Sequence, residues 1–134
     1  MAIAKMTICH WGLEKTSVII PNPSWDQVRD AILRLNNEEF NDLYLQPDLR
    51  DSETYLCVGG GAGRYLVTGS IGNEIYPTAV LATRSAEPKE LLTVGGQEGF
   101  YPANWILDLE TALQAVEAYC LLGRPGGKAT WVNA

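Results

Sequence analysis

Residues 55–68 read YLCVGGGAGRYLVT: two short runs of strand-forming residues on either side of a segment of four glycines and one alanine. Aromatic and β-branched residues favour strands, and glycines favour the turns that connect them. Apolar runs bounded by Gly, Pro, Asn or Asp continue through residues 42–82. This pattern predicts an antiparallel meander whose strands lie at residues 43–45, 55–58, 65–68 and 75–81.

The start of a first helix is visible just before this meander. Ser24 and Gln27 have the spacing of a capping box, in which the two side chains accept hydrogen bonds from each other's backbone N–H groups. We therefore expect a helix that begins at Trp25 and ends near Asn36-Asn37. Its apolar residues recur at spacings of three and four, which places them on one helix face: Val28, Ala31, Ile32 and Leu35.

A second helix is expected between Asp108 and Gly123. Asp108 can cap its first turn, and Gly123, with Pro125 after it, is typical of a helix end. Its apolar residues form a single stripe that a sheet must cover: Leu109, Ala112, Leu113, Val116 and Cys120. Further strands are expected at residues 5–11 and 17–20, as a hairpin, and at residues 91–94, 105–107 and 129–132.

The order of these elements indicates the fold class. Two helices separated by a run of strands, without regular alternation, are typical of an α+β fold. We expect a mostly antiparallel sheet with both helices packed on one face. A chain of 134 residues is long enough for one hydrophobic core and too short for two, so we expect a single domain over residues 1–134.

Charge is unevenly distributed along the chain. Ten Lys and Arg residues against sixteen Asp and Glu residues give a net charge of -6. Surfaces that bind phosphate backbones are basic, so we expect a basic protein partner and no direct contact with nucleic acid. Residues 38–53 hold six acids against the single base Arg50: Glu38, Glu39, Asp42, Asp48, Asp51 and Glu53. One interpretation is a solvated loop, and the other is a docking surface for a basic protein.

Aromatic side chains supply much of the binding energy at protein interfaces. The candidate anchors, provided that they are exposed, are Tyr44, Tyr55, Phe100 and Tyr101. We take the six acids, together with Tyr44 and Tyr101, as the candidate partner-binding residues.

Cellular location is indicated by the cysteines and by hydropathy. Cys9, Cys57 and Cys120 form an odd, widely spaced set, which favours reduced thiols over a disulfide framework. The first ten residues, MAIAKMTICH, lack the apolar segment and cleavage site of a secretory signal. No apolar run approaches the roughly 18 residues of a membrane-spanning helix. We therefore expect a cytoplasmic protein with no membrane partner.

Two glycine motifs resemble known functional motifs, but the rest of the sequence does not fit those functions. The run at residues 59–63 has the composition of a phosphate cradle, but such a loop must open a helix, and residues 65–68 are strand formers. Gly95-Gly96-Gln97 matches the tripeptide that peptide release factors place at the ribosomal peptidyl-transferase centre, but those domains need a basic surface. We expect a hairpin loop at the first motif and a strand-ending turn at the second.

Catalytic arrangements are not recognisable in the sequence. His10 is the only histidine, and Cys9 beside it lies on the same expected strand. Successive strand residues point to opposite faces, so the two cannot form a nucleophile and base pair. Sixteen acids offer no identifiable catalytic pair. We expect a half-buried strand histidine, no metal site, no cofactor and no enzymatic activity.

Taken together and in order, five groups of residues resemble the Imm-one type of immunity proteins from bacterial polymorphic toxin systems. The resemblance spans nearly the whole chain and is carried by Asn22-Pro23-Ser24-Trp25, residues 58–65, Gly95-Gly96-Gln97 with Tyr101-Pro102, residues 108–113, and Trp131. It implies a small cytosolic α+β protein, encoded beside a secreted toxin, that binds the toxin domain and protects its producer. The toxins associated with this family are often nucleic-acid deaminases.

The resemblance and the charge distribution lead to one hypothesis. A deaminase must present a basic channel to its nucleic-acid substrate, and an acidic inhibitor suits such a channel. We expect a monomer that blocks this cleft in a one-to-one complex, with residues 38–53 at the interface. Two alternatives stay open: a ligand-binding or hydrolytic domain that uses the glycine loops at 59–63 and 95–96, and a chaperone-like partner of a secretion component.

Overall fold

The structure, a computed structural model, describes residues 1–12 and 14–134. The strands of its main sheet are β1 (Lys5–Trp11), β2 (Lys15–Pro21), β3 (Asp42–Gln46), β4 (Tyr55–Gly61), β5 (Arg64–Ser70), β6 (Pro77–Val80) and β9 (Thr130–Asn133). Within the described residues these seven strands pair antiparallel in the order β2-β1-β3-β4-β5-β6-β9. Two further strands, β7 (Glu90–Val94) and β8 (Gln97–Tyr101), form a separate hairpin. The expected N-terminal hairpin and meander are therefore present, although Leu13, between β1 and β2 in the sequence, lies outside the described residues.

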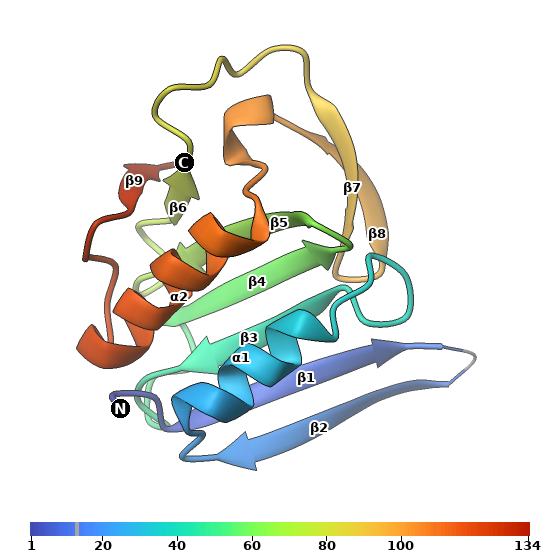
Figure 1. The fold of residues 1–134 in the computed structure, drawn as a ribbon. Coiled ribbons are helices and arrows are strands. Elements are labelled where there is room, and N and C mark those ends of the chain that lie inside the picture. The colour runs from blue at the N-terminus through green and yellow to red at the C-terminus, as the bar shows by residue number, and fades with distance from the viewer. Residues whose placement is uncertain (13) are drawn as a thin grey trace.

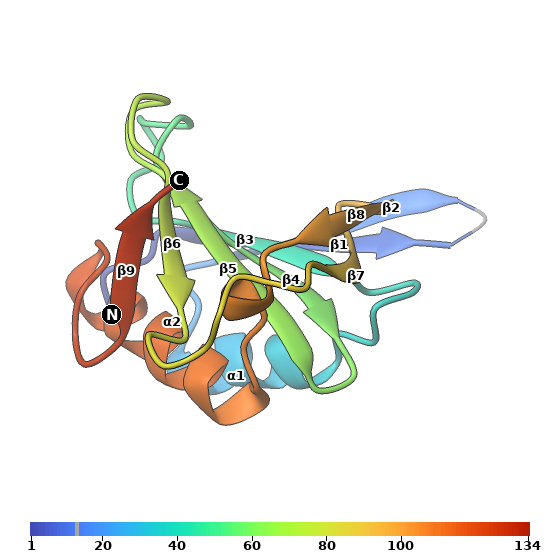
Figure 2. The same cartoon turned by 90° about the horizontal axis from the view of Figure 1, so that it is seen from above.

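Two helices of the described chain, α1 (Trp25–Leu33) and α2 (Leu109–Leu122), cover one face of the sheet (Figure 1, Figure 2). Both begin at the expected caps: Ser24 and Gln27 form the capping box, and Asp108 accepts a hydrogen bond from the backbone N–H of Thr111 at 2.7 Å. Gly123 ends α2 in a left-handed conformation with φ 71°. The expected α+β class, with both helices on one face of an antiparallel sheet, is confirmed.

Helix α1 ends earlier than expected. It stops at Leu33, with Arg34 as its C-cap residue. Asn36 donates its backbone N–H to the carbonyl of Phe40 at 2.7 Å and forms a bridge with Gly61. Asn36 is therefore held against β4 and Asn37 has a positive φ of 62°, so neither residue continues the helix.

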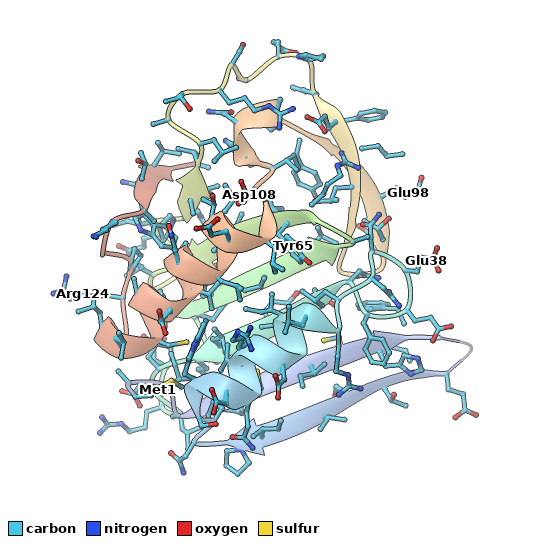
Figure 3. The ribbon with its side chains drawn as sticks, in the orientation of Figure 1. Met1, Glu38, Tyr65, Glu98, Asp108 and Arg124 are labelled. Atoms are coloured by element: carbon cyan, nitrogen blue, oxygen red, sulfur yellow. The ribbon has the colours of Figure 1, made fainter. Side chains whose placement is uncertain are left out.

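The hydrophobic core lies between the helices and the sheet. Strand register places Met6 opposite Leu45 and Leu45 opposite Leu56, so that alternate residues of β1, β3 and β4 point to the helices. Buried residues of both helices pack against them, including Val28 and Val116. Tyr65 of β5 also lies between the sheet and α2 (Figure 3). The intervening strand residues therefore point to the opposite side of the sheet, which neither α1 nor α2 covers.

The glycine run of residues 59–63 differs from the expected hairpin loop. Gly59, Gly60 and Gly61 belong to β4 and are buried, and only Ala62 and Gly63 make the turn to β5. Neighbouring groups occupy the space where a side chain would stand. Val94 packs at Gly59, and the backbone of Leu35 and Asn36 passes Gly61. The Arg64 carbonyl and the Leu92 side chain both lie at Gly60. These glycines are in the strand because other parts of the chain approach it closely.

The segment from residue 91 to residue 107 also differs in part from expectation. The strand at 91–94 pairs with residues 97–101 rather than with the main sheet. Gly95-Gly96 is the turn between these two strands, which confirms the expected strand-ending turn. The strand expected at 105–107 is wrong: residues Ala103–Trp105 form a 3-10 helix. Leu107 alone pairs with Tyr65, through two backbone hydrogen bonds of 2.8 and 2.9 Å.

None of the helices in the described part of the chain is both long and apolar enough to span a membrane.

Replacement of Gly61 by Ala should destabilise the fold far more than the same replacement at Gly72. Both glycines have positive φ, which costs an alanine about 1 kcal/mol or more. A Cβ at Gly72 meets open space, whereas a Cβ at Gly61 overlaps the backbone of Leu35 and Asn36. We expect the free energy of unfolding to fall by about 1 kcal/mol for Gly72→Ala and by about 3 kcal/mol for Gly61→Ala. Urea denaturation of both variants measures the difference, and equal losses would contradict this account.

Candidate functional site

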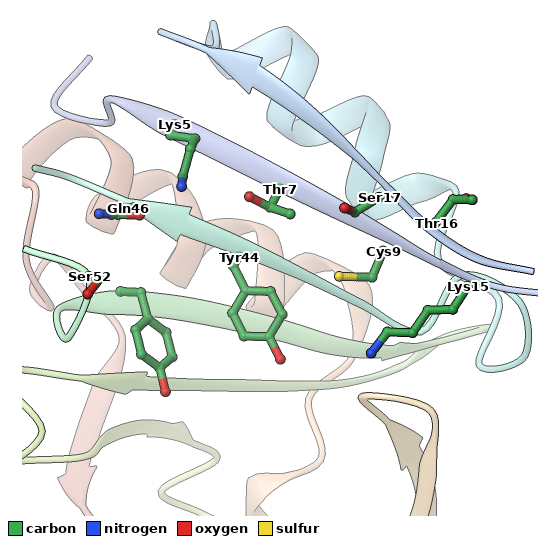
Figure 4. A pocket seen from close by; sticks show the side chains of 10 residues that line it. Lys5, Thr7, Cys9, Lys15, Thr16, Ser17, Tyr44, Gln46 and Ser52 are labelled. Atoms are coloured by element: carbon green, nitrogen blue, oxygen red, sulfur yellow. The ribbon is translucent and has the colours of Figure 1, made fainter. Parts of the chain in front are cut away.

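The face of the sheet opposite the helices is hollowed over β1, β2, β3 and β4. We call this hollow the open-face trough; it has a volume of about 440 Å³ (Figure 4). Ten residues line it: Lys5, Thr7, Cys9, Lys15, Thr16, Ser17, Tyr44, Gln46, Ser52 and Tyr55. Strand alternation explains the lining residues on β1 and β3, because core residues such as Met6 and Leu45 point the other way. The trough is thus the polar side of the strands whose apolar side forms the core.

Two tyrosines form part of the floor of this trough. Tyr44 on β3 and Tyr55 on β4 pack edge to face, with ring centroids 5.7 Å apart. Both are half-buried, and burial raises the pKa of Tyr44 well above its ordinary value. Tyr44, a candidate partner contact, therefore faces the open side of the sheet as a neutral phenol.

The six acids of residues 38–53 do not form one patch. Glu38 (Figure 3) and its neighbour Glu39 lie exposed in the connection from α1 to β3. Residues 48–53 follow β3, at its other end, and strand β3 spans about 15 Å. Asp42 lies between the two groups and is only 1% exposed. The acidic stretch therefore provides two separate exposed groups. Asp42 was expected in an exposed docking surface, but it belongs to neither group because it is buried.

His10 lies beside the first of these acidic groups. Its ring stacks on Phe40 with centroids 4.7 Å apart, and its Nε2 lies 3.1 Å from Oε2 of Glu39. Cys9 points to the trough, on the other face of the sheet. The expected half-buried strand histidine is confirmed, and so is its separation from Cys9.

The second acidic group belongs to a larger surface formed by two connected loops. Ser70 Oγ donates a hydrogen bond to the Glu53 carbonyl at 2.7 Å, and the backbone N–H of Gly72 donates to Thr54 Oγ1 at 3.0 Å. These bonds join the β3–β4 and β5–β6 connections, which project from the sheet away from the helices (Figure 2). We call this surface, residues 47–54 and 70–76, the acidic tip.

The acidic tip combines exposed apolar side chains with carboxylates. Its exposed apolar residues are Leu49, Ile71, Ile75 and Tyr76, and Leu49 is 64% exposed. Its acidic residues are Asp48, Asp51, Glu53 and Glu74. Arg50 donates two side-chain hydrogen bonds to Asp48 and so lowers the pKa of that carboxyl. The sequence did not point to residues 71–76 as part of a surface, because Ile75 and Tyr76 fall within the strand expected at residues 75–81, whereas β6 begins at Pro77.

The β7-β8 hairpin carries the remaining aromatic candidates. Phe100 points outward and is 70% exposed, opposite Leu91 on the neighbouring strand. Tyr101 packs inward against a small cluster that contains Leu92 and Ile106, and burial raises its pKa. Of the four proposed aromatic anchors, Phe100 is thus the exposed one, and Tyr101 is partly buried.

Asp42 and its neighbours hold this hairpin on the sheet. The indole N–H of Trp11 donates to Asp42 Oδ1 at 2.6 Å, and the Trp11 ring packs at Gly96 in the hairpin turn. Asn41 accepts a hydrogen bond from the backbone N–H of Gly96 at 3.0 Å, and Asn37 accepts one from Thr93 at 2.9 Å. The second oxygen of Asp42 is buried and has no hydrogen-bond partner among residues 1–12 and 14–134. These residues have a structural role that the sequence did not reveal.

The three cysteines are free thiols. Burial, followed by the charge of Asp42, raises the pKa of Cys9 to about 11. Burial likewise raises the pKa of Cys57 and of Cys120 to about 12. All three therefore stay protonated near neutral pH, which does not suit a thiolate nucleophile. Within residues 1–12 and 14–134, no cluster of three or more His, Cys, Asp or Glu residues is arranged to hold a metal ion.

Comparison with known protein families identifies the chain. The family model for immunity protein Imm1 matches residues 19–133, from β2 to β9. The chain belongs to the Imm1 family of immunity proteins. The matched region includes both helices and the acidic tip, and family membership gives the chain an immunity role with a cognate toxin as partner. No curated protein and no solved structure gave a match to the chain.

Loss of the Asp42 charge should make Cys9 react faster with iodoacetamide. The Asp42 carboxylate raises the pKa of this thiol, so Asp42→Asn lowers the pKa and increases the thiolate fraction at mildly alkaline pH. Burial remains, so the pKa should stay above its ordinary value of 9.0. Alkylation followed by peptide mass spectrometry measures the rate, with Cys120 as the internal control. An unchanged Cys9 rate in the variant would contradict this assignment.

Proposed function

We propose that this protein binds the toxin encoded beside its gene and blocks the toxin's substrate cleft, with the acidic tip as the principal contact. One observation carries the proposal. The acidic tip places four exposed apolar side chains among four carboxylates, on loops that project from the sheet. Apolar anchors within a charged rim are typical of protein interfaces. Membership of an immunity protein family supports a toxin as the partner.

Long-range attraction and short-range contact have different sources in this surface. The carboxylates attract a basic partner and accelerate encounter. The apolar side chains slow dissociation, because their burial removes apolar surface from water. An interface of ordinary size buries about 800 Å² on each partner. Glu38 and Glu39, at the other end of β3, extend the attraction beyond the acidic tip.

The toxin is a nucleic-acid deaminase. Enzymes that act on a nucleic-acid base bind the surrounding phosphates with basic residues. An acidic surface on the inhibitor complements such a channel and excludes the substrate from it. This immunity protein acts in the cytoplasm as a monomer, in a one-to-one complex, and contributes no chemistry of its own. The partner-binding residues are Glu38, Glu39, Asp48, Asp51, Glu53, Tyr44 and Tyr101, joined by the apolar residues of the acidic tip.

The alternative of a ligand pocket at the glycine motifs has less support. Val94 and Leu92 fill the space beside Gly59 and Gly60, and Trp11 packs at Gly96. The glycines therefore serve close packing between segments of this chain. A chaperone-like role remains distinguishable by experiment, because a chaperone would bind a secretion component without inhibiting the toxin.

Co-purification with the neighbouring toxin domain tests the proposal directly. The complex is assayed for deamination of single-stranded and double-stranded nucleic acid, with and without this protein. We expect a stoichiometric complex and loss of deaminase activity. A complex without inhibition would contradict cleft blockade, and the absence of a complex would overturn the proposed function for that toxin.

Neutralisation of the acidic tip should slow association with the toxin. The test variant carries Asp48→Asn, Asp51→Asn, Glu53→Gln and Glu74→Gln. We expect the association rate to fall by about tenfold or more at low salt, with little remaining dependence on ionic strength. A matched control neutralises four exposed acids on the helices: Asp26→Asn, Asp30→Asn, Glu110→Gln and Glu117→Gln. Equal association rates for the two variants would show that the rate depends on net charge alone, which would contradict a specific role of the acidic tip.

Truncation of one apolar anchor should weaken the complex without affecting the free protein. Leu49→Ala removes a side chain that is 64% exposed, so the free energy of unfolding should change by less than about 0.5 kcal/mol. Toxin affinity should fall by about tenfold, mainly through faster dissociation. Leu121→Ala, at the end of α2, is the matched control because Leu121 is 66% exposed. Titration calorimetry measures the toxin affinity of both variants. An unchanged affinity for Leu49→Ala would show that Leu49 is not part of the interface.

A further inference from the structure

The sign of the surface charge reverses between the two acidic groups. The open-face trough lies over the centre of β3, between Glu38-Glu39 at one end of that strand and the acidic tip at the other. Lys5 and Lys15 line the trough (Figure 4), and none of its ten lining residues is acidic. In a chain with sixteen acids against ten bases, this is a local excess of positive charge on a negative surface.

Both lysines are available to a partner. Neither forms an ion pair within the described parts of the chain. The Lys15 ammonium lies 4.1 Å from the centroid of the Trp11 ring, a contact that holds its position and uses none of its N–H donors. Hydroxyl groups of Thr7, Ser17 and Ser52 stand between or beside the two lysines and add further donors. The trough is therefore lined by donors suited to carboxylate and carbonyl oxygens.

The shape of the trough favours an elongated occupant. Lys5 lies at one end of β1, and Lys15 pairs with Trp11 at the other end. Lys5 and Trp11 are six residue steps apart along the strand, a distance of about 20 Å between backbones. From this geometry we infer that the trough receives an extended, acidic segment of the toxin, an inference that rests on the proposed function.

This arrangement makes the binding surface a pattern of alternating charge. A partner must present basic groups to both ends of β3 and an acidic segment to the trough between them. A basic protein without such a segment leaves the two lysines facing its own positive charge, which disfavours the complex. The acidic groups accelerate encounter with basic proteins in general, and the trough selects the toxin that fits.

Reversal of the trough charge provides a test in which two explanations predict opposite signs. Lys5→Glu together with Lys15→Glu makes the protein more acidic, so net charge alone predicts tighter binding to a basic toxin. Our inference predicts weaker binding, with the dissociation constant raised by about tenfold or more. The matched control is Lys89→Glu with Lys128→Glu, two exposed lysines from connecting segments that change the net charge equally. The control complex should bind as tightly as the unchanged protein or more tightly.

The outcomes separate the inference from the proposed function. If the unchanged protein forms no complex with the toxin, the proposed function fails, and the inference fails with it. If it forms a complex and the two double variants bind alike, the inference alone is overturned. Lys5→Gln with Lys15→Gln repeats the test without introduced charge, and thermal unfolding confirms that each variant is folded. Citrate is the probe for a small-anion site: saturable binding of citrate that depends on both lysines, with toxin affinity unaffected by their replacement, would also overturn the inference.

Discussion

The close approach of two chain segments, strand β7 and residues 35–36, to β4 is the constraint on which the rest of this structure depends. Gly59, Gly60 and Gly61 lack side chains. Val94 lies at the first, Leu92 and the Arg64 carbonyl at the second, and the backbone of Leu35 and Asn36 at the third. The first two contacts hold the β7-β8 hairpin on the sheet, and the third directs the connection from α1 into β3. Because β3 follows that connection, the position of both acidic groups depends on these glycines. A side chain at any of the three positions would separate elements that the surface needs together.

Local signals in the sequence were sufficient for the helices and for most strands. The capping residues Ser24 and Asp108 act within a few residues of themselves, so their effect can be predicted without knowledge of the fold. The glycines of β4 could not be assigned in this way, because a glycine in a turn and a glycine under a packed side chain look alike in sequence. The prediction of a strand at residues 105–107 was wrong for a similar reason. Of these three residues, only Leu107 pairs with a strand residue, Tyr65.

The candidate site could be predicted only in part. The density of acidic residues in the sequence pointed to residues 38–53. In the structure, strand β3 separates these acids into two exposed groups, and Asp42 belongs to neither because it is buried. The burial of Asp42 depends on Trp11, which is 31 residues away in sequence. The apolar half of the acidic tip and the basic trough come from separate strands and loops. Their residues become one surface only after the sheet has formed, so no pattern along the chain could announce them.

The groups that hold the acidic tip together are different from the side chains that it exposes. Recognition of a partner can therefore change in evolution without a loss of stability. The two loops are joined through the Glu53 carbonyl and the backbone N–H of Gly72, together with small hydroxyl side chains at their bases. The exposed side chains at their ends contribute little to these joints. Substitutions at residues such as Leu49 and Ile75 can therefore accumulate without loss of the scaffold, since surface loops tolerate change far better than the core beneath them. A lineage that meets a diverging toxin can follow it through these few positions while the sheet and helices stay the same.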